Sequence, residues 1–119
     1  MKNGQMVNVT WGDFKGQQGF ITMLNGKNVV LYLIEKKYEV ATFSTDILEP
    51  IPAPNIPTLL ADSTIEEKQV NGITYTLSKI KDYDFYGVLA ASPTTGLSLP
   101  SNHRYFVTEQ QAQEYLNTL

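Results

Sequence analysis

The chain has 119 residues, 42% of them hydrophobic and 11% aromatic, which is enough for one modest core or two very small ones. Its formal net charge is −3, from nine basic and twelve acidic side chains, and this argues against a strong, sequence-independent binder of nucleic acid. Because it contains no cysteine, a disulfide framework and thiolate chemistry are excluded.

The first 50 residues have the pattern of a meander of short strands. Apolar residues that alternate or run together predict strands over 5–10, 19–24, 27–34 and 38–43. Asn25-Gly26 predicts a type I′ hairpin turn, because both central positions of that turn need a positive φ. A turn or single helical turn is expected over Ser44–Leu48, before a last edge strand. Short strands spaced about ten residues apart imply a small closed barrel.

A proline-rich segment follows this predicted barrel. Pro50, Pro52, Pro54 and Pro57 fall within eight residues, and such spacing forbids a helix or a central strand. It favours an extended polyproline II spacer, with a docking ligand for a proline-reading domain as the alternative. We therefore predict a barrel over residues 1–49, a linker over 50–58 and a second unit over 59–119.

The second unit is predicted to contain three strands and a helix. Residues 58–69 are ambiguous, because Ser63-x-x-Glu66 fits a helix capping box while Val70-Asn71-Gly72-Ile73 fits a hairpin turn. Strands are expected over 73–80 and 85–91, and a third within 97–106, around Pro100. Thr108 caps a final helix whose apolar face consists of Ala112, Tyr115, Leu116 and Leu119. The predicted fold is thus mainly β with one C-terminal helix: a small SH3-like β-barrel, then a β-β-β-α unit.

The loop between the first two strands is unusually rich in glycine. Gly12-Asp13-Phe14-Lys15-Gly16-Gln17-Gln18-Gly19 holds three glycines in eight residues, more than an ordinary hairpin needs. This segment and its flanks resemble the KOW motif of NusG-type transcription elongation factors and of several large-subunit ribosomal proteins. The likeness covers residues 2–50 and rests on Gly4, Val7, Val9, Gly12, Phe14, Lys15, Gly16, Gly19 and Ile21.

The resemblance implies a five-stranded SH3-like barrel that binds RNA, ribosomal components or transcription proteins, mainly through its loops. Two features of those families are missing: the N-terminal domain of NusG-type factors and the basic surface of the ribosomal members. Their absence from this sequence favours a protein partner over RNA.

The glycine loop supplies the main candidate binding residues. Trp11, Phe14 and Lys15 place aromatic rings beside a cation, which could stack on a base or enter a protein groove. Gln17 and Gln18 would add adaptable hydrogen bonds. In the alternative reading, Trp11 and Phe14 plug the end of the barrel and Lys15 is a solvated turn residue.

A secondary candidate lies in the second unit. Lys79, Lys81 and Arg104 could form a small positive face. The order of three strands and a helix is loosely similar to plant AP2-type and integrase-arm DNA-binding domains, but those are richly basic. Three cations would give weak phosphate binding at best, so DNA is an unlikely partner.

Catalysis has little support in the sequence. A lone His103 cannot build a zinc site, no nucleophile-elbow pattern frames a serine, and no Gly-Lys-Ser/Thr follows the glycine loop. We expect no enzyme, no metal and no cofactor. The longest apolar run, Val29–Ile34, is far short of the roughly 20 residues of a membrane span, and no secretory signal is visible, so we expect a cytoplasmic protein.

Three hypotheses follow. The first is a non-enzymatic module that contacts a transcription or translation component, protein or RNA, through the KOW-like loop. The second is a structural or regulatory interaction protein, oligomeric or phage-borne, in which the barrel is a scaffold. The third is weak DNA binding by residues 71–119.

Overall fold

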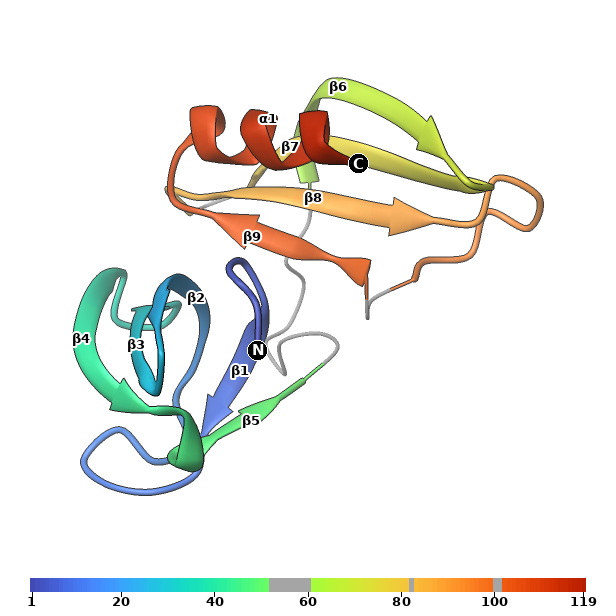
Figure 1. Cartoon of the computed structure of the whole chain (residues 1–119). Helices are drawn as coiled ribbons and strands as arrows, with labels where there is room; N and C mark the ends of the chain where they lie inside the picture. The colour runs from blue at the N-terminus through green and yellow to red at the C-terminus, as the bar shows by residue number, and fades with distance from the viewer. Residues whose placement is uncertain (52–60, 82, 100–101) are drawn as a thin grey trace.

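The fold consists of two antiparallel sheets and one C-terminal α-helix in the part of the chain that the structure describes (Figure 1). The structure is a computed structural model, and it describes residues 1–51, 61–81, 83–99 and 102–119. The first 50 residues form a five-stranded sheet and the second unit a four-stranded sheet. The predicted fold class is confirmed, and the second unit contains one strand more than predicted.

The first sheet forms the predicted SH3-like barrel. Its strands follow the order β4-β3-β2-β1-β5, so β1 lies between β2 and β5. The elements are β1 (Met6–Val9), β2 (Gln18–Asn25), β3 (Asn28–Leu33), β4 (Tyr38–Ser44), the 3-10 helix η1 (Thr45–Ile47) and β5 (Leu48–Pro50). All five strands contribute to one buried cluster, so the sheet must curl around its own interior. That cluster consists of Val7, Val9, Ile21, Val29, Leu31, Leu33, Phe43 and Leu48.

The hairpin between β2 and β3 is present, but its predicted type I′ turn is wrong. Asn25 pairs with Asn28, so Gly26 and Lys27 are the central residues of the turn. Of these two, only Gly26 has a positive φ, at 63°. One positive φ at the first central position is what a type II′ turn requires, and glycine meets that requirement at little cost.

The second sheet has the order β6-β7-β8-β9. Its strands are β6 (Ala61–Val70), β7 (Ile73–Ile80), β8 (Tyr86–Ala91) and β9 (Arg104–Phe106). The ambiguous segment 58–69 supplies the additional strand β6, in which Glu66 pairs with Leu77, so a helix capped at Ser63 is wrong. The predicted third strand is confined to β9, and Pro100 lies outside the described residues.

The helix α1 (Glu109–Thr118) begins and ends as capping chemistry predicts. The Thr108 hydroxyl accepts a hydrogen bond from the Gln111 amide at 3.1 Å. At the other end, the Lys68 ammonium donates to the carbonyls of Leu116 (3.2 Å) and Leu119 (2.7 Å). Its positive charge there interacts favourably with the negative end of the helix dipole. The helix covers one face of the second sheet, with a shared core of Tyr75, Leu77, Val88, Ala90, Ala112 and Leu116.

The opposite face of the second sheet packs against the outside of the barrel. Aromatic rings dominate this joint: the Phe20 centroid lies 5.1 Å from that of Tyr32 and 5.1 Å from that of Phe85. The two units therefore share one hydrophobic cluster at the joint. Its buried members are Met6, Phe20, Tyr32 and Ile34 from the barrel, and Ile80, Phe85 and Tyr105 from the second unit.

Backbone hydrogen bonds through Gly4 reinforce the joint. The Gly4 amide donates to the Ile21 carbonyl at 2.7 Å, and the Gly4 carbonyl accepts from the Tyr105 amide at 2.8 Å. Gly4 has a φ of +82°, and a Cβ there would lie 3.0 Å from the Phe106 ring. Only glycine fits this close approach without strain. Most of the predicted linker, residues 52–58, lies outside the described residues.

Candidate functional site

The glycine loop between β1 and β2 has a defined shape. The Gly16 amide donates to the Val9 carbonyl at 2.8 Å, and the Lys15 amide donates to the Gly12 carbonyl at 3.1 Å. Gly12 and Gly16 have φ values of 93° and 87°, which other residues rarely adopt. The loop lies at the end of the barrel that points away from the second sheet (Figure 1). It is therefore both ordered by its own backbone and remote from the joint.

The two aromatic residues of the loop have different roles. Trp11 is 73% exposed, so the reading in which it plugs the barrel end is wrong. Phe14 is half-buried against the barrel core, where its ring meets the Phe43 ring edge-on at 5.7 Å. Lys15 is exposed. The loop thus anchors one ring inside and presents a tryptophan and an ammonium outside.

The two glutamines lie at the base of the loop. The Gln17 carbonyl accepts from the Val9 amide at 2.9 Å, and its side-chain Oε1 is buried without a hydrogen-bond partner in the described part of the chain. Gln18 begins β2 opposite Asn8 and is half-buried. Four of the five predicted residues therefore lie in the loop and Gln18 begins β2, with Trp11 and Lys15 the most accessible of the five.

A groove of about 200 Å³ lies beside Trp11. Three of the residues that line this groove were not predicted from the sequence: Val40 and Phe43 of β4, and Ile47 of η1. They lie beside the loop because the sheet curls and because Thr10 binds η1, with its amide donating to the Ile47 carbonyl at 2.8 Å. The groove also includes Gly12, Asp13 and Phe14, so it is mainly apolar with one carboxylate.

The three cations of the second unit lie at different places. The Lys79 ammonium donates to the Tyr83 carbonyl at 3.0 Å, and the Arg104 guanidinium donates to the His103 carbonyl at 2.7 Å. Lys81 follows the end of β7 and is exposed. Two of the three cations are thus engaged with backbone carbonyl groups.

The lone histidine lies next to a serine, but its geometry does not activate that serine. His103 Nε2 lies 3.2 Å from the Ala90 carbonyl oxygen and 3.3 Å from Ser98 Oγ. Because a carbonyl only accepts, Nε2 must carry the hydrogen and cannot take a proton from the hydroxyl. Burial lowers the pKa of His103, as does the Arg104 charge, against the Ala90 hydrogen bond that raises it.

The described residues contain no group of three His, Cys, Asp or Glu side chains placed to hold a metal ion. Among the helices described, none is long and apolar enough to cross a membrane. Comparison with models of known protein families gives no match, and neither does comparison with curated protein sequences. A function for this protein is therefore inferred from the geometry of its glycine loop and of its cavities.

Proposed function

We propose that this protein is a non-enzymatic binding module that contacts a protein of the transcription or translation machinery through Trp11 and the groove beside it. The observation that carries the proposal is the 73% exposure of Trp11 on a loop held in place by backbone hydrogen bonds. Tryptophan is among the residues that contribute most to protein interfaces, and ordering it beforehand lowers the entropy cost of binding. The class of partner follows from the KOW resemblance.

The chemistry of the groove favours a protein over a nucleic acid. Its walls include Val40, Phe43 and Ile47, which suit an apolar side chain of a partner. The nearby charges, Asp13 and Lys15, are of opposite sign and so provide little attraction for phosphate. An apolar residue of the partner would enter the groove while Trp11 covers it.

RNA is the second candidate, because an exposed indole beside an ammonium could stack on a base next to a phosphate. With Lys15 as the one cation of this loop, the affinity would be low and would fall with salt. We place either role in the cytoplasm. The Nε2–H of His103, which faces a carbonyl, supports a non-enzymatic role.

The test is a pull-down from cell extract with wild-type protein and Trp11→Ala, each with and without nuclease. Met23→Ala is the matched control, since Met23 is also an exposed apolar side chain of the barrel, at 61%. We expect one protein to be recovered by wild type and by Met23→Ala, to be lost with Trp11→Ala, and to resist nuclease. Equal recovery by Trp11→Ala would contradict the proposal, and loss after nuclease treatment would favour RNA.

A further inference from the structure

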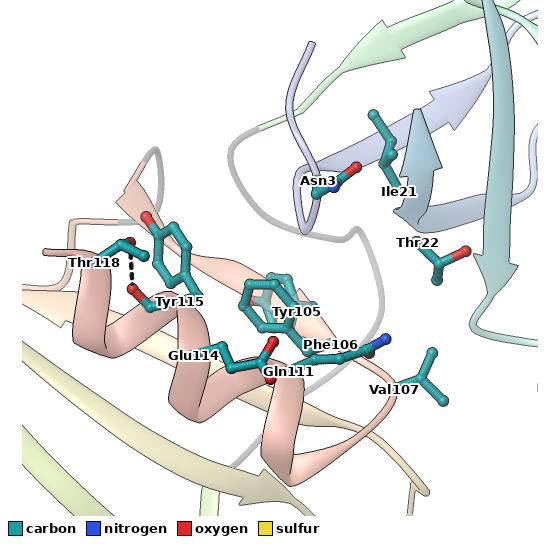
Figure 2. Close-up of a pocket in the computed structure, with 10 residues that line it drawn as sticks. All are labelled: Asn3, Ile21, Thr22, Tyr105, Phe106, Val107, Gln111, Glu114, Tyr115 and Thr118. Carbon is teal, nitrogen blue, oxygen red and sulfur yellow. Dashed lines mark hydrogen bonds between the residues drawn. The ribbon is translucent and has the colours of Figure 1, made fainter. Parts of the chain in front are cut away.

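A second cavity, of about 370 Å³, lies at the joint between the two units. Figure 2 shows its walls: the N-terminal turn and β2 on one side, β9 and α1 on the other. Its volume is in the range of small-molecule sites. Because both units contribute walls, the cavity exists only in the assembled fold.

Two aromatic rings, those of Phe106 and Tyr115, contribute to the inner surface of this cleft beside its polar groups. Ile21 and Tyr105 are nearly fully buried, whereas Phe106 and Tyr115 are half-buried. The rings of Phe106 and Tyr115 pack together with centroids 5.3 Å apart and planes 34° apart. The Tyr115 phenol is uncharged at neutral pH, and burial raises its pKa further, against the nearby Arg104 charge, which lowers it. Such a surface favours stacking of another flat ring.

Polar groups on the rim come from both units. Asn3 and Thr22 belong to the barrel, and Gln111 and Glu114 to α1 (Figure 2). Within the described part of the chain, the Glu114 carboxylate has one hydrogen bond, to Oε1 from the Gln110 amide at 3.2 Å, so its second oxygen can accept another. The rim therefore offers two amides, which donate and accept, and a carboxylate, which accepts.

Glu114 is the one charged group among the described residues that line the cleft. Arg104 lies outside the lining, and its guanidinium donates to the His103 carbonyl. No lysine or arginine is among the described residues that line the cleft, although the Arg104 charge reaches the Tyr115 phenol, so a phosphate or carboxylate in the cleft would meet Glu114 without a cation in the lining. A ligand of this cleft should be flat and should not carry a negative charge.

We propose that the cleft binds a heteroaromatic ring with an exocyclic amino group, that is, a nucleobase such as adenine in an unphosphorylated nucleoside. The ring would stack on Phe106 and Tyr115, and its edge would exchange hydrogen bonds with the Asn3 and Gln111 amides. The amino group would donate to Glu114, whose charge strengthens that bond. This proposal is independent of the Trp11 site.

The experiment titrates the protein with adenosine, with purine riboside (which lacks the amino group) and with AMP, and follows backbone and side-chain amides by NMR. We expect adenosine to shift the side-chain signals of Asn3 and Gln111, and purine riboside to bind about tenfold more weakly. Adenosine should also bind at least as tightly as AMP. The Trp11→Ala variant should bind adenosine as wild type does.

Single substitutions test whether the Glu114 carboxylate itself contributes to binding. Glu114→Gln should weaken adenosine binding about tenfold and reduce the preference over purine riboside, because a neutral amide oxygen accepts a weaker hydrogen bond than a carboxylate does. Glu67→Gln, an exposed carboxylate on β6, is the matched control and should change nothing. Gln111→Ala, at an exposed helix position, should also weaken binding.

Four outcomes would overturn the proposal. The first is the absence of shifts at about 5 mM adenosine, a concentration at which even weak binding is visible. The others are equal binding of adenosine and purine riboside, tighter binding of AMP than of adenosine, and shifts that map away from the cleft.

Discussion

Phe85 packs between the two sheets, and we expect its substitution to affect the unfolding of both. Its ring is fully buried, with centroids 5.1 Å from Phe20 and 5.6 Å from Tyr32 of the barrel, and 6.1 Å from Tyr105 of the second sheet. The side chain therefore holds residues of both units in one cluster. Replacing it with alanine opens a cavity where the units meet, so both units lose contacts.

The expected loss of unfolding free energy for Phe85→Ala is about 4 kcal/mol. A fully buried phenylalanine replaced by alanine costs about 3–5 kcal/mol, which includes the apolar transfer and the residual cavity. Small domains are stable by about 5–15 kcal/mol, so this variant loses a large part of its stability. Phe85→Leu keeps most of the volume and should cost about 1–2 kcal/mol, which keeps the protein folded for measurement.

The assay is urea denaturation followed residue by residue by NMR. Amide signals of Leu31 in the barrel and of Leu77 in the second sheet, both fully buried, report on the two units separately. We expect Phe85→Leu to shift both transitions to the same lower urea concentration, and the exposed-site control Met23→Ala to shift neither. A transition of Leu31 that stays at its wild-type midpoint while that of Leu77 moves would refute the idea of one cooperative core.

Three further outcomes are expected. Gly4→Ala should lower the free energy of unfolding by about 1–3 kcal/mol, and by more than Gly12→Ala does. Both glycines have a positive φ, but of the two only Gly4 lacks room for a Cβ. Equal urea midpoints for the two variants would contradict this. Lys68→Met should cost about 1 kcal/mol by removing the charge at the last carbonyls of α1, and helical circular dichroism during melting would report it. The pKa of His103 is lowered in the folded protein, so its contribution to stability is complete above its ordinary pKa of 6.5 and is lost as pH falls through the lowered value. His103→Gln should make the thermal midpoint depend less on pH as the pH falls below the ordinary histidine pKa of about 6.5, and an unchanged pH dependence would rule out this histidine as the cause.

The barrel strands were predictable because their signals are local. Alternation of apolar residues marks one face of a strand, and glycines with positive φ mark the turns. The helix was predictable for the same reason, since Thr108 and the apolar spacing after it are contained in a dozen residues. Strand β6 was not predictable in this way, because Ser63-x-x-Glu66 also fits the capping box of a helix. Its pairing with β7 favours the strand over the helix.

The joint between the units could not be predicted from one segment. A signal was present in β3, where Leu31 and Leu33 face the barrel interior while Tyr32 faces outward and is also buried. A strand that is apolar on both sides indicates that something covers its outer face. The sequence does not say what covers it, because Phe85 and Tyr105 come from distant positions in the chain.

The candidate site was predictable only in part. The glycine spacing identifies a shaped loop, and its aromatic residues are candidates for recognition. Which ring projects depends on the barrel end, where Phe43 provides a surface for Phe14 and leaves Trp11 in solvent. The walls from Val40 and Ile47 arise from the curl of the sheet, which local pattern does not describe.

The shared aromatic joint also fixes the distance between the two ends of the molecule. The chain measures 42 × 28 × 25 Å along its principal axes, and the glycine loop and α1 lie at opposite ends of it (Figure 1). A swivel between the halves would have to pull Phe20, Phe85 and Tyr105 out of the cluster that they share, and the exposure of that apolar surface opposes it.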